Sequence, residues 1–326
     1  MFKRILIPVD RSALAEQAVG QAAAIARASG AELDLVLVHE PMAFDGYADA
    51  PWNADALREA RKYLARLDAE IESGSSLSVV SALLKGEPVD MICRRITDVR
   101  ADLVVMTSHG RTGLSRAWMG SVAEGVLRHS TVPVLVLRPT VTKRQRDAGH
   151  HLFKHLLVPV DGSPLSAEVV GSAAALAQCG NGRITLLRVV QPIPIATAEP
   201  GFAYIPPFVD EAATSRLVDE ANEKLVALAA RLRNAYGVAV DANVTVHPLV
   251  AAAIIDVARA NDVDLIAMST HGRGMSRFVM GSVADKVVRG SGMPTLVYRP
   301  LRTRGVLPTK ESASEPSATT GSLSVI

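Results

Sequence analysis

Short apolar runs alternate with longer amphipathic stretches along most of the chain. Five runs in its first part predict β-strands, at Ile5–Val9, Leu33–Val38, Leu77–Ala82, Leu103–Met106 and Val134–Leu137. They are apolar at successive positions rather than at every second one, which is typical of strands buried on both faces. Helical patterns fill the intervals, at residues 13–28, 54–72, 88–99 and 120–129.

The ends of these helical patterns carry the expected signals. Ser12 stands where an N-cap is needed, and Pro88 fits the first turn of a helix. Strands that alternate with helices imply right-handed crossovers and a parallel, doubly wound sheet. We therefore predict an α/β fold of the Rossmann-like type, with a five-stranded parallel sheet flanked by helices.

The whole pattern is then repeated. KRILIPVDRSALAEQAV at Lys3 returns as KHLLVPVDGSPLSAEVV at Lys154, and the later glycine-containing segments end at Pro139 and Pro300. Strands of the second copy are expected at residues 155–160, 184–190, 242–247, 264–268 and 295–298. A repeat of this length in fixed order predicts two tandem copies of one doubly wound domain.

The repeat also predicts the domain boundaries. The two domains are residues 1–139 and 153–300, the charged segment 140–152 is a linker, and the Ser-, Thr- and Pro-rich tail 301–326 is expected to be disordered. The last strands of the two copies, Val132–Leu137 and Met293–Tyr298, should lie at sheet edges. Because bare apolar edges are a liability, we expect the halves to pair through them about a pseudo-two-fold axis. One chain would then imitate a homodimer, and a homodimer of whole chains stays an open alternative.

The composition argues against a nucleic-acid-binding, a disulfide-rich or a membrane-spanning protein. The 326 residues are 48% hydrophobic and 21% charged, with a net charge of +2, which favours neither nucleic acid nor an anionic membrane surface. The two cysteines, Cys93 and Cys179, stand at non-equivalent places, so a disulfide framework is not indicated. No signal-peptide core and no apolar run of about 18 residues is apparent. We expect a cytoplasmic protein without a membrane span.

Two proline-rich connections carry an unusual concentration of aromatic residues. These are Phe44, Tyr47 and Trp52 in the first copy and Phe202, Tyr204 and Phe208 in the second. We favour the interpretation that they cap the core or pack on the other half, since exposed aromatics in such number would be costly. A lid or a surface for a protein partner is the alternative.

The loop after the fourth strand carries the chemistry. It reads Thr107 to Gly113 as TSHGRTG, and a helix begins soon afterwards at Gly120-Ser121. Small residues let a backbone approach a ligand closely, and the amides at a helix N-terminus form an anion site. The loop also lies at the carboxyl edge of a parallel sheet, where such folds bind ligands. A plain helix N-cap is the alternative, but the recurrence of the arrangement in the second copy favours a phosphate site.

This combination resembles the universal stress protein family. The family fingerprint is Gly, two residues, Gly, nine residues, then Gly-Ser or Gly-Thr. The first copy has Gly110, nine residues and Gly120-Ser121, together with the opening ILIPVDRS, the GEPVDMI segment and the closing VPVLVLRP. The resemblance covers residues 2–139 and 153–300 and implies a tandem member with two such domains.

The resemblance also implies where an adenine nucleotide would bind. In ATP-binding members, the Asp after the first strand and the backbone of the second hold the adenine, while ribose and phosphates follow the fingerprint. In the first copy these positions are Asp10, Val38, Met106, Thr107, His109, Gly110, Gly120, Ser121 and Val122. In the second copy they are Asp161, Val189, Met268, Ser269, His271, Gly272, Gly281, Ser282 and Val283. The implied cofactor is ATP, with ADP or AMP and a companion Mg²⁺ as alternatives.

The sequence departs from the family pattern in three places. The first fingerprint glycine is Thr107 in one copy and Ser269 in the other, which would crowd the ribose slightly. Eight residues rather than nine separate Gly272 from Gly281, so the second phosphate loop is tighter. The GEP segment has no clear match in the second copy, where VHPLVAAAII stands. We therefore expect the first site to bind ATP at least as tightly as the second.

A catalytic interpretation has less support. His109 and His271 have no paired carboxylate nearby in the sequence to fix a tautomer, so we expect no catalytic residue. Asp10 and Asp161 are isolated carboxylates, which are weak indicators of a metal site. Arg111, and Arg273 in the second copy, follow the loop glycine and either reach a phosphate or lie in solvent.

Three functions fit this sequence. The first is an ATP-binding regulatory protein of the stress response, which the glycine fingerprint favours. The second is a slow ATPase or a nucleotidyl transferase, and the third is a nucleotide-free interaction module. No GxxxxGK[ST] motif is present and no GxGxxG follows the first strand, so kinase-like and dehydrogenase-like functions are not indicated.

Overall fold

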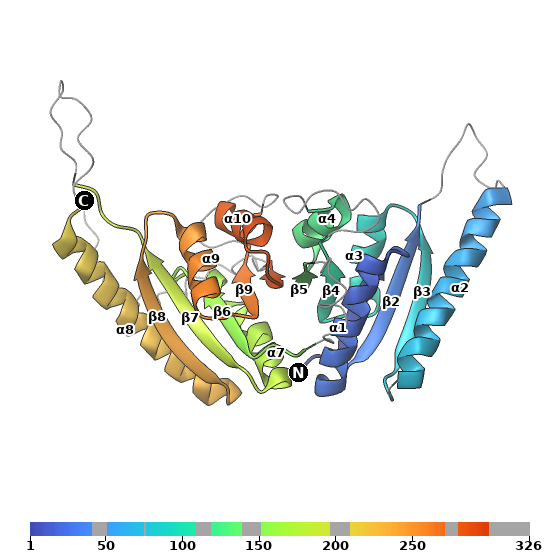
Figure 1. The fold of residues 1–326 in the computed structure, drawn as a ribbon, viewed down its shortest axis with the longest axis horizontal. Helices are drawn as coiled ribbons and strands as arrows, with labels where there is room; N and C mark the ends of the chain where they lie inside the picture. Colours follow the sequence, from blue (N-terminus) through green and yellow to red (C-terminus); the bar gives the residue numbers. More distant parts are fainter. Residues whose placement is uncertain are drawn as a thin grey trace, which may run out of the picture.

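The computed structural model describes residues 1–40, 51–74, 76–108, 119–138, 151–195, 209–270 and 280–299 (Figure 1). The helices and strands of the first half are β1 (Arg4–Val9), α1 (Ala13–Ser29), β2 (Glu32–His39), α2 (Pro51–Gly74), β3 (Val79–Lys85), α3 (Pro88–Asp98), β4 (Leu103–Thr107), α4 (Ser121–His129) and β5 (Val134–Leu137). Those of the second half are β6 (His155–Pro159), α6 (Pro164–Ala167), α7 (Val170–Gly180), β7 (Arg183–Val190), α8 (Glu211–Tyr236), β8 (Ala239–Val246), α9 (Val250–Ala260), β9 (Leu265–Ser269), α10 (Ser282–Gly290) and β10 (Thr295–Tyr298). Strands alternate with helices in both halves, as predicted.

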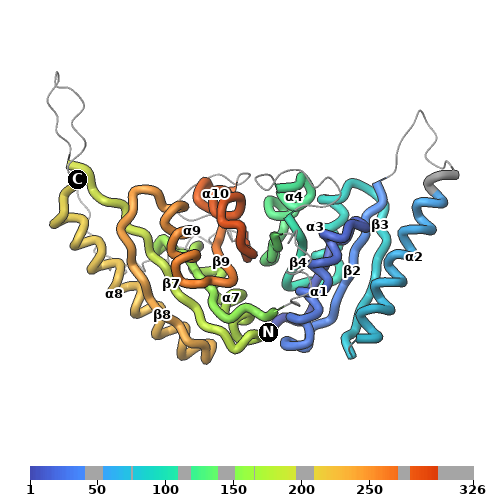
Figure 2. Tube along the Cα trace, in the orientation of Figure 1, coloured from blue at the N-terminus to red at the C-terminus, as the bar shows by residue number. Residues whose placement is uncertain are grey.

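All ten strands of the described residues form one sheet, in the order β3-β2-β1-β4-β5-β10-β9-β6-β7-β8. Pairing is parallel within each half, and β5 and β10 pair in the antiparallel direction at the centre. The expected pairing of the halves through their last strands is therefore confirmed. Figure 2 shows the halves as two arms on either side of the centre, where β5 pairs with β10.

Each face of the sheet carries a core that runs through both halves. One core packs β-strand side chains such as Leu35 and Leu37 against α1, α2, α7 and α8. The other packs Val36 and its neighbours against α3, α4, α9 and α10. Adjacent residues of one strand thus belong to opposite cores, which explains why the strands read as continuous apolar runs. Among the described helices, none combines the length and apolar character needed to cross a bilayer.

Three predicted elements begin two or three residues away from their observed starts. β3 lies at Val79–Lys85, two to three residues beyond the predicted Leu77–Ala82, because the pairing with β2 begins at Val79. α2 begins at Pro51 rather than at residue 54, with the proline in the first turn where its missing amide costs nothing. β8 begins at Ala239 rather than at residue 242. It is an outer strand, and the exposed Asp241 separates its first two residues from the predicted segment that begins at Ala242.

A buried histidine distinguishes the second half. His155 lies at the start of β6, at the position that Arg4 has at the start of β1. The His155 residue is only 7% exposed. Its Nδ1 lies 3.0 Å from the Asn261 carbonyl oxygen, and its Nε2 lies 2.9 Å from the Thr185 hydroxyl. The contacts with Asn261 and Thr185 fit a neutral ring that donates from Nδ1 and accepts at Nε2, and the Arg183 guanidinium lies 3.3 Å from the same Nδ1.

We expect His155 to make the folded protein sensitive to acid. Burial, and then the nearby Arg183 guanidinium, lower the pKa of His155 below its ordinary 6.5, and the opposing carboxylates Asp264 and Asp241 act more weakly. Below pH 6.5 the unfolded chain therefore takes up a proton that the folded chain refuses. The free energy of unfolding should fall with pH there by at most about 1.4 kcal/mol per unit, and hold constant above it.

Urea unfolding between pH 4.5 and 8 measures this slope. His155→Gln should flatten it, whereas His151→Gln, at an exposed histidine, should leave it unchanged. Equal slopes for the wild-type protein and His155→Gln would contradict the assignment.

Candidate functional site

In each half the strand order reverses beside the first strand, and we call the region at the carboxyl ends of the strands there the crevice of that half. β1 pairs with β2 over six residues but with β4 over only two, Ile5 with Leu103 and Leu6 with Val104. The strand order reverses between β1 and β4, and the ends of the two strands beyond this short pairing border the crevice where doubly wound folds bind ligands. β6 and β9 repeat the arrangement, with pairing limited to Leu156–Leu265 and Leu157–Ile266.

The turn after β1 is built around Asp10. The Asp10 Oδ1 accepts a hydrogen bond from the Ser12 amide at 3.0 Å, and the Ser12 hydroxyl caps α1 at the Ala15 amide. The predicted N-cap is thus confirmed. Between them, Arg11 has a φ of 69°, so the turn uses a left-handed conformation that side chains rarely adopt.

The second half builds the same turn with different residues. The Asp161 Oδ1 accepts hydrogen bonds from the amide and the hydroxyl of Ser163, at 2.9 Å and 2.6 Å. The left-handed position is Gly162, with a φ of 80°. Both predicted aspartates therefore hold the strand-to-helix turn beside the crevice, and this turn fixes how each carboxylate is oriented.

The predicted strand residues lie around the same crevices. Met106 and Met268 are each 5% exposed and form part of the core under α4 and α10. Val38 and Val189 pack against that core near the ends of β2 and β7. The residue that follows each methionine, Thr107 or Ser269, ends β4 or β9.

Two buried polar atoms beside these residues have no hydrogen-bond partner in the described part of the chain. They are the Ser269 hydroxyl and the Nε2 of His39, the residue after Val38. Ser269 stands at a predicted site position, whereas sequence analysis did not single out His39. Because buried polar groups are normally paired, these atoms are available to a polar ligand.

The start of α4 is tied to the end of β4. The Gly120 amide donates to the Ser108 carbonyl oxygen at 2.8 Å, and the Ser108 amide donates to the Leu137 carbonyl oxygen at the end of β5. Gly120 is the N-cap, and no side chain caps the helix. Ser121 is exposed, and the amides in the first turn of α4 lack partners within the helix.

The start of α10 repeats this construction. The Gly281 amide donates to the Thr270 carbonyl oxygen at 2.9 Å, and the Thr270 amide donates to the Tyr298 carbonyl oxygen. A Cβ on Gly281 would lie only 2.4 Å from that Thr270 oxygen. The fingerprint glycine is therefore required by a backbone contact, in addition to any need for space around a phosphate. The backbone contacts of Ser108 and Thr270 were not predicted from the sequence, because a backbone hydrogen bond does not depend on the type of side chain.

Several predicted positions lie outside the described residues. These are His109, Gly110, His271 and Gly272, together with Arg111, Arg273 and the shorter second loop. The same holds for the aromatic connections, apart from the backbone of Trp52 in the first turn of α2. The predictions made for these residues stay predictions. Among the described residues, no cluster of three or more metal-ligating side chains occurs.

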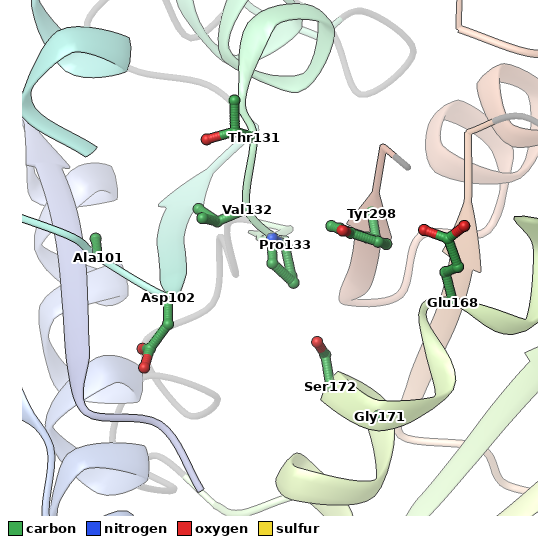
Figure 3. A pocket seen from close by; sticks show the side chains of 9 residues that line it. All are labelled: Ala101, Asp102, Thr131, Val132, Pro133, Glu168, Gly171, Ser172 and Tyr298. Atoms are coloured by element: carbon green, nitrogen blue, oxygen red, sulfur yellow. The ribbon is translucent and has the colours of Figure 1, made fainter. Parts of the chain in front are cut away.

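A separate pocket of about 430 Å³ lies between the halves, away from both crevices. Its lining residues are Ala101, Asp102, Thr131, Val132, Pro133, Glu168, Gly171, Ser172 and Tyr298. Figure 3 shows the Tyr298 ring beside the Glu168 carboxylate, with Pro133 opposite. Burial, and then Glu168, raise the pKa of the Tyr298 phenol. None of the predicted nucleotide-site residues lines this pocket.

Comparison with known proteins identifies the family of both halves. The sequence model of the universal stress protein family matches residues 1–138 and again residues 152–299. A universal stress protein of Methanocaldococcus jannaschii is 30% identical over 141 residues, which are 42% of this chain and 83% of that protein. One from Thermus aquaticus is 32% identical over 139 residues, which are 42% of this chain and all of that protein.

Solved structures resemble the whole arrangement. A universal stress protein from Archaeoglobus fulgidus superposes with a TM-score of 0.63 at 20% identity, covering 91% of this chain and 98% of that one. A putative universal stress protein from Pseudomonas aeruginosa gives 0.61 at 16% identity, covering 92% and 94%. At these identities the likeness establishes the fold alone.

The contact at the start of α10 predicts the effect of a single methyl group. Gly281→Ala should lower the free energy of unfolding by about 1–3 kcal/mol, because the Thr270 carbonyl is backbone and cannot rotate away. Gly74→Ala is the matched control, since a Cβ there meets nothing within 4 Å. The melting temperatures of the two variants are compared by thermal unfolding. Equal melting temperatures would show that the backbone at the start of α10 moves to accept the extra methyl group without a cost in stability.

Proposed function

The chain belongs to the universal stress protein family, and from this premise we propose that it binds ATP in both crevices as a regulator in the stress response. Nucleotide occupancy would alter the surface that the protein presents to a partner. The family connects the chain with stress response. We propose in addition that the ligand is ATP, that both halves bind it and that the protein acts as a regulator.

The observation that carries the proposal is the pair of uncapped helix starts. α4 and α10 each begin at a glycine without a side-chain cap, beside the crevice where the strand order reverses. In the first half, Ser12 caps α1 and Glu87 caps α3 with a side chain. In the second half, α7 and α9 also begin without a side-chain cap, but at Val169 and Leu249 rather than at a glycine. Free amides and the positive end of the helix dipole suit a phosphate chain.

The rest of each crevice suits the remainder of an adenine nucleotide. The Asp10 and Asp161 carboxylates are acceptors at the ends of β1 and β6, which fits the exocyclic amine of adenine. The unpartnered Ser269 hydroxyl supports a polar ligand group, such as a ribose hydroxyl, in the second half. In the first half, Thr107 holds the equivalent place but is already engaged by a neighbour.

We place this activity in the cytoplasm. Both cysteines are free thiols, Cys179 is buried, and burial raises the pKa of the Cys93 thiol to about 11. Protonated, unpaired thiols fit a reducing compartment. A protein partner at the aromatic connections is part of the same proposal.

A carboxylate at the start of each helix provides the sharpest test. Ser121→Asp should weaken ATP binding in the first site more than tenfold, because like charges about 4 Å apart near a protein surface repel by about 4 kcal/mol. The same substitution suits the helix dipole, so the melting temperature should hold or rise. Ser282→Asp should act in the same way on the second site.

Calorimetric titration with ATP measures the outcome as stoichiometry. We expect two nucleotides per wild-type chain, one for each single variant and none for the double variant. Ser121→Asn and Ser282→Asn serve as uncharged controls and should retain both sites. The wild-type titration should show the first site at least as tight as the second, and unchanged stoichiometry in the double variant would refute the assignment of the phosphate sites.

A further inference from the structure

Two arginines reach across the centre of the molecule to the helices of the other half. Arg138 follows β5, and its guanidinium donates to the Val288 carbonyl oxygen near the end of α10. Arg299 follows β10, and its guanidinium donates to the Arg128 carbonyl oxygen near the end of α4. The last carbonyls of a helix lack partners within the helix and carry the negative end of its dipole. Each arginine thus caps a helix that belongs to the opposite half.

These caps continue the bonds that fix the helix starts. At the start of α4, the Gly120 amide donates to the carbonyl oxygen of Ser108. The Ser108 amide in turn donates to the carbonyl oxygen of Leu137. The next residue along the chain is Arg138, which holds Val288 at the far end of α10. The start of one helix is therefore linked to the end of the other.

The second half makes the equivalent series of hydrogen bonds in the opposite direction, from the start of α10 to the end of α4. At the start of α10, the Gly281 amide donates to the carbonyl oxygen of Thr270. The Thr270 amide in turn donates to the carbonyl oxygen of Tyr298. The next residue is Arg299, which holds Arg128 at the far end of α4. The two helices and the two strand ends form a closed ring of hydrogen bonds that passes both uncapped helix starts.

Charged side chains join the two helices a second time. The Arg289 guanidinium, on α10, lies 2.7 Å from the Asp285 carboxylate and 3.3 Å from the Glu124 carboxylate on α4. Glu124 also pairs with Arg128 on its own helix. The side chains of Arg289 and Glu124 are each 27% exposed, so the pair is partly shielded from water. α4 and α10 lie on the same side of the sheet, next to β5 and β10 (Figure 1).

We propose that Arg138 and Arg299 are positioning residues that couple the two nucleotide sites, each acting on the site in the other half. The proposal rests on the phosphate sites proposed above. A nine-residue helix is a rod about 14 Å long, so a shift at its start moves its last carbonyls. Nucleotide at the start of α4 would move Arg128, then Arg299 and the end of β10, and so the start of α10. Because coupling is reciprocal, the second site would act on the first to the same extent.

The ring is tested first in the full-length protein without nucleotide. Hydrogen exchange should speed up in the last turn of α10 in Arg138→Met and in the last turn of α4 in Arg299→Met. Methionine keeps the apolar stem and removes the donor. Arg138→Lys should restore slow exchange in part, because an ammonium still caps a carbonyl. Arg94→Met, at an arginine with a 75% exposed side chain, is the control and should change neither helix.

The coupling is tested next by ATP titration, read as protection of amides 119–124 and 280–285. Arg138→Met should weaken the second site, and Arg299→Met the first, by about two- to fivefold, which is the usual effect of a charge at a helix end. In the wild-type protein, ATP at one site should change the affinity of the other. In the double variant, the two sites should fill independently.

The two proposals fail in different ways. If ATP protects neither helix start, the proposed function is wrong, while the exchange measurement without nucleotide still decides whether the ring exists. If ATP binds but each arginine affects only the site of its own half, or neither, the crossed coupling is overturned. Independent filling of the two wild-type sites would overturn it as well.

Discussion

The arrangement of the molecule depends on one short antiparallel contact, in which three residue pairs join β5 to β10. Without it the chain would hold two five-stranded sheets, each with an apolar edge such as Leu135 or Leu296 open to water. With it, both cores run through the whole protein. The same contact brings the ends of β5 and β10 past one another, so that the residue after each strand reaches a helix of the other half.

The sequence predicts most of the fold and part of the site. The central strand β5 was predicted at its observed bounds, since a fully buried strand is uniformly apolar. The outer strand β8 was placed too late because polar residues face water along it. The aspartates after β1 and β6 are recognisable from their place at a strand end. The hydrogen bond from Arg138 to Val288 cannot be recognised in the sequence, because a contact between residues 150 positions apart leaves no local pattern.

Glycine shows how a correct motif can have more than one cause. Gly281 belongs to the family fingerprint, and sequence analysis explained it by the space that a phosphate needs. The structure adds a backbone oxygen 2.4 Å from the position of a Cβ. A sequence pattern records that a side chain is not tolerated, but it does not record which neighbour excludes it. Geometry is needed to separate the fold's requirement from the ligand's.

The two halves also differ in ways that two copies of one gene product cannot. In the first half the buried Asp34 accepts hydrogen bonds from the Nε and Nη2 of Arg95, at 3.0 Å and 2.8 Å, whereas in the second half His155 of β6 contacts Thr185 of β7. Joined in one chain, the halves stay paired at any dilution, since their encounter is intramolecular and its effective concentration is set by the connection between them. Separate chains joined by the same contacts would come apart as their concentration fell. A protein present at a few molecules per cell can therefore keep two unlike halves together, in a fixed ratio of one to one.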